Sequence, residues 1–511
     1  MKINLASNNW VHQRGVSVAG EYLYKSLYRN DKLHNDLSRI KTKDDLQSII
    51  AKIHGSFALV IRSGSFVYLV TDNVRSIPIF YSVEYNFITD RLDVGITSRI
   101  SSMEFDTDSV GIFKRTGYVL NERSLLKSIN QVESAQIVLL GAGKVIKNNY
   151  WSYSVTRDLS FSKPNFTNLK SESIDILDKI SNRVVSLLDG RQAVVPLSGG
   201  YDSRLILSLL KLKNYTNIVC FTYGSYRSPE VQIAKAICTQ LKVKLITIDF
   251  NKNFFEKEFE YDEFENFVRF ASNYISLPHM QDFYAVKHMF RSKLIHKNAV
   301  FLPGHSGDIF AGTHIMFGVD STSSRDEVIK GIVRKHFAMN KNVFFDPSRI
   351  AYDDMCHPQS NMELWSWRER QSKFIVNSVM TYKFFGYSFI LPLWDPDLAH
   401  FYSRVPLEFK NRRARLGYIK DKNLYDCVCS HFFKQLKIES FLRPSEPRLI
   451  RMTRRLWSKL FSLDGINNLD LLLDAVDRCS QSKQNASARR TYKFNENLIN
   501  ITLNIYNAHN P

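Results

Sequence analysis

The chain has 511 residues, 44% of them hydrophobic and 23% charged, a composition typical of a folded protein with more than one domain. Its formal net charge of +19 is compatible with nucleic acid, membrane surface or anionic substrate, and the basic residues are too dispersed to favour one. No window approaches the roughly 20 apolar residues of a membrane span or the apolar core of a signal peptide, so we expect a cytoplasmic protein that does not bind membranes.

Residues 1 to about 150 have the pattern of strands and turns. Apolar runs over 55–62, 66–70 and 78–82 are separated by polar connections, and a helical pattern covers residues 43–54. Such short runs between turn residues predict antiparallel β-layers.

The stretch with the most specific chemistry begins with an apolar run over residues 193–197, which predicts a buried strand. A Ser-Gly-Gly turn follows and leads into an apolar helix. Glycines allow the backbone to approach an anion, and the first N–H groups of a helix point at it along the positive end of the dipole. Asp202 is suited to hold a magnesium ion beside a polyphosphate. We expect the nucleotide to contact Leu197, Ser198, Gly199, Gly200, Asp202 and Ser203.

The segments that follow alternate between strand and helix. Residues 218–224 and 244–249 predict two further buried strands, and a helix begins near Pro229. This alternation is typical of a doubly wound α/β sheet, in which ligands gather at the carboxyl ends of the strands. We therefore expect Tyr223 and Gly224, which end a strand, to border the same nucleotide crevice.

A second glycine-rich turn follows the apolar run over residues 299–302. It contains Gly304, which we expect at the nucleotide, and a single carboxylate, Asp308.

These features resemble asparagine synthetase B. Ser198-Gly199-Gly200-Tyr201-Asp202-Ser203 resembles the family's pyrophosphate-binding loop, and Gly55-Ser56-Phe57-Ala58 and Pro78-Ile79-Phe80-Tyr81 resemble its glutaminase domain. The resemblance implies an α/β protein with an N-terminal glutaminase-like antiparallel β-layer domain over 1–152. It further implies a doubly wound ATP-pyrophosphatase domain with helical additions over 168–511. It also places Asp308 with Asp202 as the catalytic, magnesium-binding pair.

One departure from the family concerns the glutaminase. That activity needs a cysteine directly after the initiator methionine, whereas this chain has Lys2, and its first cysteine is Cys220. The remaining cysteines are scattered without the paired spacing of a zinc site, so we expect reduced thiols. The front domain is thus expected to lack glutaminase activity, as in β-lactam synthetase and lasso-peptide cyclase.

The resemblance implies an ATP-dependent ligase that activates a carboxylate as an acyl-adenylate, releases pyrophosphate and forms an amide. ATP and Mg²⁺ are the implied cofactors. A small-molecule carboxylate and ammonia or an amine are the implied partners, and a homodimer is left open. The family's amide-forming lysine has no secure counterpart, and the candidates are Lys420, Lys422, Lys434 and Arg443.

Two alternatives remain. A tRNA-modifying adenylating enzyme shares the loop and suits the basic charge, but the sequence shows no RNA-binding module, so we expect no specific nucleic-acid partner. A non-catalytic scaffold is favoured by Lys2 and by Ile309, where the family has an acidic residue, but is opposed by the intact phosphate loop.

Overall fold

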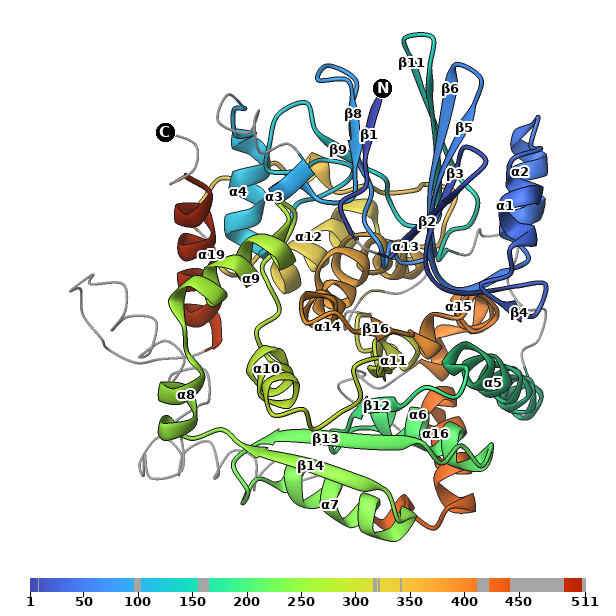
Figure 1. Cartoon of the computed structure of the whole chain (residues 1–511), viewed down its shortest axis with the longest axis vertical. Helices are drawn as coiled ribbons and strands as arrows, with labels where there is room; N and C mark the ends of the chain where they lie inside the picture. Colours follow the sequence, from blue (N-terminus) through green and yellow to red (C-terminus); the bar gives the residue numbers. More distant parts are fainter. Residues whose placement is uncertain are drawn as a thin grey trace.

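A computed structural model describes residues 1–7, 9–95, 103–154, 165–315, 319, 322–340, 342–410, 422–441 and 491–507. Within these ranges the chain is a mixed α/β protein with three sheets (Figure 1). None of the helices in this part of the chain combines the length and the apolarity that a bilayer crossing requires.

The largest sheet has seven strands, all paired antiparallel, in the order β11-β10-β6-β5-β3-β2 with β4 beside β3. Its strands are β2 (Trp10–Gln13), β3 (Val16–Tyr24), β4 (Leu27–Tyr28), β5 (Ile53–Ser63), β6 (Phe66–Thr71), β10 (Gln136–Gly141) and β11 (Lys144–Asn149). The helices α1 (Lys32–Leu37) and α2 (Lys43–Ile50) connect β4 to β5. The helix expected over 43–54 therefore ends at Ile50, because the chain is already paired in β5 from Ile53.

A second sheet has the order β1-β8-β7-β9. It is formed by β1 (Lys2–Asn4), β7 (Phe80–Ser82), β8 (Phe87–Thr89) and β9 (Asn130–Gln131). Because β1 runs parallel to β8, this layer is mixed, and the expectation of purely antiparallel layers was wrong for it. The helices α3 (Leu92–Gly95) and α4 (Thr107–Thr116) lie between β8 and β9 in the chain.

The third sheet is entirely parallel, in the order β14-β13-β12-β15-β16. Its strands are β12 (Ala193–Pro196), β13 (Ile218–Gly224), β14 (Lys244–Asp249), β15 (Val300–Phe301) and β16 (Ser388–Phe389). The strands β13 and β14 lie on one side of β12, and the later strands β15 and β16 lie on its other side. A ligand crevice is expected where the strand order reverses, beyond the carboxyl ends of β12 and β15.

Helices pack around this sheet and join it to the front of the chain. They include α5 (Phe166–Leu188), α6 (Tyr201–Leu212), α7 (Pro229–Leu241), α8 (Lys252–Glu258), α9 (Tyr261–Ser272), α10 (Phe283–Arg291), α11 (Gly307–Phe310), α12 (Arg325–His336), α13 (Pro358–Trp365), the π-helix η4 (Ser366–Ile375), α14 (Met380–Phe384), α15 (Pro396–Arg404), α16 (Leu424–Gln435) and α19 (Thr491–Asn507). Short 3₁₀ turns are η3 (Pro347–Arg349), η5 (Val376–Val379), η6 (Pro392–Trp394), η7 (Leu407–Phe409) and η9 (Glu439–Phe441).

The front of the chain is hydrogen-bonded to the later part through a pair of extended segments. Val119 N donates to Ile275 O at 2.8 Å, and Leu277 N donates to Gly117 O at 2.7 Å. The indole of Trp367 in η4 donates to Asn73 O at 2.7 Å. The segment that follows α4 is therefore fixed against the C-terminal part by backbone pairing. Residues 155–164, within the connection expected between the domains, lie outside the described residues.

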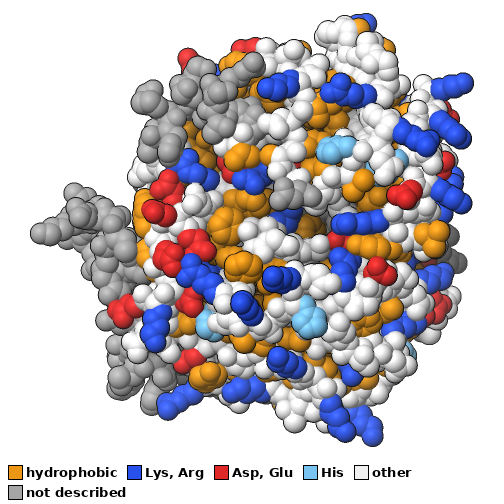
Figure 2. Space-filling model, in the orientation of Figure 1, with side chains coloured by type: hydrophobic (Ala, Val, Ile, Leu, Met, Phe, Trp, Pro, Cys, Tyr) orange, Lys and Arg blue, Asp and Glu red, His pale blue; other side chains and the backbone are white. Residues whose placement is uncertain are grey.

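The Lys and Arg side chains are dispersed over the surface shown in Figure 2, as they are along the sequence. On the face drawn in Figure 2, Lys and Arg side chains are spread over the outline among apolar and polar groups, while Asp and Glu gather mainly on its left side. This face shows no single basic stripe of the kind that tracks a nucleic-acid backbone.

Candidate active site

The loop between β12 and α6 is a tight turn closed by its own serines. Ser198 N donates to Ser203 Oγ at 3.1 Å, and Gly200 N donates to Ser198 Oγ at 3.2 Å. Gly200 is the N-cap of α6, and no side chain caps this helix. The positive end of the helix dipole is therefore directed at the loop, as in other anion-binding turns.

Arg204 supports this loop from behind. Its buried guanidinium donates to Gly199 O and to Ile438 O, both at 3.3 Å, and lies 5.1 Å from the ring centroid of Phe433. Burial lowers the pKa of Arg204 to about 10, so the group still carries its charge at neutral pH. Because Arg204 contacts the turn at Gly199, its charge adds to the attraction for an anion. No motif in the sequence indicated this role for Arg204.

The second glycine-rich loop, between β15 and α11, packs against the first turn of α6. A Cβ on Gly304 would lie 2.8 Å from Ser203 N and 3.0 Å from Asp202 Cβ. A Cβ on Gly307 would lie 2.0 Å from the hydroxyl of Tyr425 and 2.4 Å from Asp202 Oδ1. Only glycine permits this approach, so these two residues bring the second loop to the Asp202 carboxylate.

Asp202 and Asp308 line the same cavity, which has a volume of about 520 Å³. Tyr425 of α16 donates its hydroxyl hydrogen bond to Asp202 Oδ1 at 2.9 Å. The backbone carbonyl of Asp308 accepts hydrogen bonds from Thr313 N at 3.1 Å and Thr313 Oγ1 at 2.9 Å. Two loops that are distant in the sequence thus bring two carboxylates to one cavity, and such oxygen donors suit Mg²⁺.

Basic residues also line the cavity. They are Lys335 at the end of α12, Arg370 of η4 and His314. Lys335 Nζ donates to Thr313 O at 2.8 Å, and the Gln371 amide lies 3.0 Å from His314 Nε2. No motif in the sequence surrounds these residues, so the fold alone brings them to the cavity that the carboxylates line.

Two further histidines of the cavity have lowered basicity. Burial, followed by the nearby charges of Arg370 and Lys335, holds the pKa of His336 well below its usual range. Burial, followed by the neighbouring His279, lowers the pKa of His305 to about 4. Both rings are therefore neutral at pH 7, and the Lys and Arg residues that line the cavity are Lys335 and Arg370.

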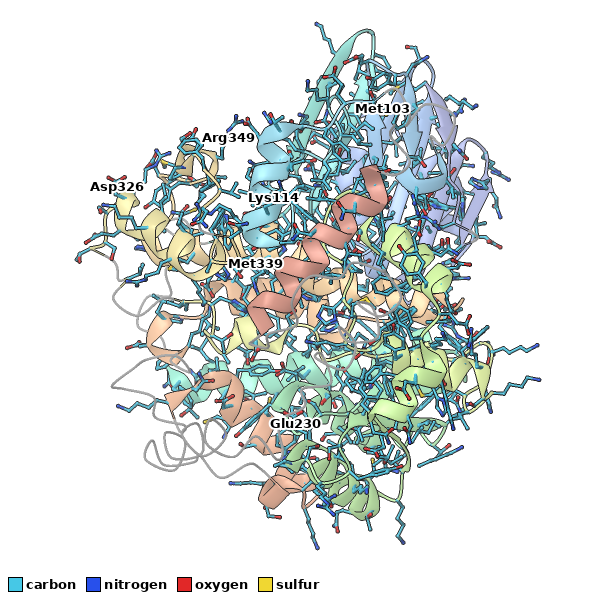
Figure 3. All side chains as sticks on the ribbon, turned by 90° about the vertical axis from the view of Figure 1, so that its left-hand side faces the viewer. Met103, Lys114, Glu230, Asp326, Met339 and Arg349 are labelled. Atoms are coloured by element: carbon cyan, nitrogen blue, oxygen red, sulfur yellow. The ribbon has the colours of Figure 1, made fainter. Side chains whose placement is uncertain are left out.

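The front of the chain closes the cavity through Thr116 and Tyr118. The ring of Tyr118 stacks on Phe374 of η4 with centroids 5.7 Å apart. Met339, which also lines the cavity, donates its backbone N–H to Arg115 O at 3.2 Å, and Figure 3 shows it near the end of the helix that carries Lys114. The cavity is thus lined by segments that are far apart in the sequence, from Thr116 to Ile375.

Two other residues expected at the nucleotide, Tyr223 and Gly224, do not line this cavity. Tyr223 donates its hydroxyl hydrogen bond to Asp282 at 2.7 Å and stacks on Phe250 with centroids 4.9 Å apart. Neither Tyr223 nor Gly224, which ends β13, is among the residues that line the cavity.

The structure describes two of the four candidates for the amide-forming residue. Lys422 and Lys434 are exposed and do not line the cavity. Lys420 and Arg443 lie outside the described residues.

Comparison with known proteins places this geometry in context. The sequence model of the asparagine synthase family matches residues 186–491, which include both loops. A protein of Acanthamoeba polyphaga mimivirus described as "Probable asparagine synthetase (glutamine-hydrolyzing)" is 26% identical over 208 residues, 39% of this chain and 35% of that protein. The microcin J25-processing protein McjC of Escherichia coli is 22% identical over 228 residues, 43% of this chain and 41% of that protein. The matches thus span well under half the length of these relatives.

Solved structures give weaker matches. The U34-tRNA thiolase NcsA from Methanococcus maripaludis aligns with 64% of this chain and 87% of its own, at 12% identity and a TM-score of 0.21. A similarity at this level supports no argument about fold or function.

Proposed function

This chain belongs to the asparagine synthase family, and from that premise we propose that it is an ATP-dependent ligase that forms amide bonds. It activates a carboxylate as an acyl-adenylate, releases pyrophosphate and transfers the acyl group to ammonia or an amine. The observation that carries this proposal is that Asp202 and Asp308 meet at one cavity beside the uncapped N-terminus of α6.

The phosphate loop binds the leaving pyrophosphate. The N-terminus of α6 and the hydroxyls of Ser198 and Ser203 favour negative charge, and Arg204 beneath the turn adds a buried positive charge. Asp202 belongs both to α6 and to the cavity. This supports the proposal that the substrate carboxylate binds in the cavity and attacks the α-phosphorus from there.

Asp202 and Asp308 fit a magnesium ion by their chemistry. Both supply carboxylate oxygens, and Gly307 allows its loop to approach the Asp202 carboxylate without an intervening side chain. The two aspartates would hold the ion, which would neutralise negative charge on phosphate oxygens. Tyr425 fixes the orientation of Asp202.

The rest of the cavity receives the acceptor. Lys335 and Arg370 bind the carboxylate that is to be activated and stabilise the negative charge that develops when the amine attacks. In this proposal Lys335 and Arg370 perform the role of the amide-forming lysine, for which the candidates from the sequence were Lys420, Lys422, Lys434 and Arg443. The neighbouring Tyr118 and Phe374 shield the reacting groups from water.

The nitrogen comes from ammonia or an amine. Residues 1–219 contain no cysteine, so this region has no thiol to hydrolyse glutamine. We propose that residues 1–152 keep a glutaminase-like fold without its chemistry and that they serve to close the cavity through Thr116 and Tyr118.

The test is ATP–pyrophosphate exchange and pyrophosphate release with Mg²⁺, a panel of carboxylates, and ammonium or amines. Asp202→Ala and Asp308→Ala should each lower the rate at least 100-fold. Asp326→Ala, at an exposed residue of α12, should leave it unchanged. Orthophosphate release, or unchanged rates in both aspartate variants, would contradict the proposal. Turnover that requires tRNA would favour the RNA-modifying alternative.

A further inference from the structure

A second cavity, of about 430 Å³, lies where the front strands meet α14 and β16, and it shares no lining residue with the first cavity. Figure 1 shows α14 and β16 beneath the N-terminal strands, and β16 contacts β3. Its volume is in the range of small-molecule sites. The charged residues that line it are Glu21, Arg29, Arg91 and Lys383.

Glu21, the carboxylate of this cavity, is already shared by two arginines. Arg29 Nη2 lies 3.0 Å from one of its oxygens, and Arg191 Nη2 lies 2.9 Å from the other. Tyr28 also donates its hydroxyl hydrogen bond to Glu21 at 2.7 Å. Burial acts to raise the pKa of Glu21, but its arginine partners, Arg191 most of all, lower it below the usual value. Glu21 is therefore ionised, and its two oxygens are already paired.

Arg91 is held in place over an aromatic wall. Its Nε donates to Asp93 Oδ1 at 2.6 Å, and its guanidinium lies 4.1 Å from the ring centroid of Phe270. This geometry leaves Arg91 fixed at the edge of the cavity, next to a partly exposed ring.

Lys383 differs from these arginines. Among the described residues, its ammonium has no recorded ion pair or hydrogen bond, and the carboxylate that acts on it is Asp90. The oxygens of Asp90 already accept hydrogen bonds from Ala6 N at 2.7 Å, Ser7 N at 3.2 Å and Trp10 Nε1 at 2.9 Å. Burial lowers the pKa of Lys383 to about 8. The charge of Asp90 acts against this shift, and the charge of Arg91 adds to it.

The three cations that line the cavity differ in their partners. Arg29 lies 3.0 Å from Glu21 and Arg91 donates to Asp93, whereas Lys383 has no ion pair among the described residues. The rest of the lining includes the apolar side chains of Ile77, Phe270, Phe384 and Phe389. A ligand that matches both properties has one negative charge and an apolar body.

We propose that this cavity is a binding site for a small organic monocarboxylate, whose carboxylate contacts Lys383 and whose apolar body packs on Phe270 and Phe384. The site is independent of the ligase chemistry, since it is separate from Asp202 and Asp308.

The test uses benzoate as the probe, titrated into the full-length protein by calorimetry. We expect saturable one-to-one binding at pH 7, weakened at least tenfold in Lys383→Met and largely retained in Lys383→Arg. The matched control is Lys144→Met, an exposed lysine of β11, which should bind as the parent protein does. Circular dichroism and the urea midpoint show whether each variant is folded.

The pH dependence gives a second readout. Binding needs the protonated Lys383, so affinity should be full below pH 7 and fall as the pH rises through about 8, the pKa of this group. Absence of saturable binding, or equal affinity in a folded Lys383→Met, would overturn the proposal. So would loss of benzoate binding in Arg370→Met, because it would place the probe in the first cavity. Retained binding in Arg370→Met supports an independent site, whether or not the ligase activity is found.

Discussion

The hydroxyl of Tyr425 donates a hydrogen bond of 2.9 Å to Asp202, although α16 and α6 are far apart in the sequence. Tyr425 is itself buried, with its ring 5.9 Å from both Phe310 and Tyr402. The aspartate that is proposed to hold magnesium is therefore oriented by a helix near the end of the described chain. This contact explains why the candidate site extends beyond the two glycine-rich loops.

Tyr425→Phe should lower pyrophosphate release three- to tenfold, because Asp202 loses the donor that fixes its orientation. The lost hydrogen bond to a charged group should also cost about 1–3 kcal/mol of stability. Initial rates and urea unfolding measure the two effects. Tyr226→Phe, at an exposed tyrosine, is the control and should change neither. Full activity in Tyr425→Phe would exclude a positioning role.

Gly307→Ala should abolish most activity. Its Cβ would lie 2.0 Å from the Tyr425 hydroxyl and 2.4 Å from Asp202 Oδ1, so the loop that carries Asp308 must move away. Gly111→Ala is the matched control. Gly111 lies within α4, where alanine is favourable, and the nearest atoms to its Cβ would be at the ordinary contact distances of 3.6 and 3.7 Å. Comparable rates in the two variants would show that the close approach of the loops is dispensable.

Lys373→Met should destabilise the protein by about 3–5 kcal/mol, because it leaves the buried Glu369 carboxylate without its ion pair. Lys373 Nζ lies 2.6 Å from Glu369 and 4.0 Å from Glu133, and its side chain is fully buried. The urea midpoint measures the loss. Lys127→Met, whose partner Glu104 is exposed, should leave the midpoint unchanged.

The same pair bears on activity. Lys373 and Glu369 anchor η4 to the segment at Asn121, whereas Arg370 and Phe374 of this helix line the cavity. Activity in Lys373→Met should therefore fall at temperatures where the protein is still folded. A variant that keeps both stability and activity would contradict the anchoring role of this ion pair.

His305 should make stability fall in mild acid. Its pKa is lowered from 6.5 to about 4 in the folded state, mainly by burial. Between these values the unfolded chain takes up a proton that the folded chain does not, so stability decreases as the pH falls from 6.5 towards 4. Urea midpoints at pH 7.0, 5.5 and 4.5 should decrease less steeply in His305→Gln. The exposed His12→Gln should follow the parent protein, and identical slopes in all three would refute the assignment.

The strands and helices that surround the phosphate loop could be predicted closely. The apolar run over 193–197, the glycine turn and the following helix became β12 and α6, and the predicted strand over 218–224 is β13. These predictions succeed because periodicity and turn chemistry are local properties. The direction of β1 could not be predicted, because parallel or antiparallel pairing depends on where a distant partner, β8, comes to lie.

The local chemistry of the phosphate loop follows from its residues: a strand, two glycines and a helix start that together favour an anion, with Asp202 in the first helical turn. The pairing of Asp202 with Asp308 was expected from the family resemblance, whereas the other groups at the cavity depend on the packing of distant segments. This packing brought Lys335 and Arg370 into one cavity with the two aspartates and turned the Tyr223 hydroxyl towards Asp282. The physical reason is that a hydrophobic pattern shows which face of an element is buried, whereas the partner of that face depends on the packing of the whole chain.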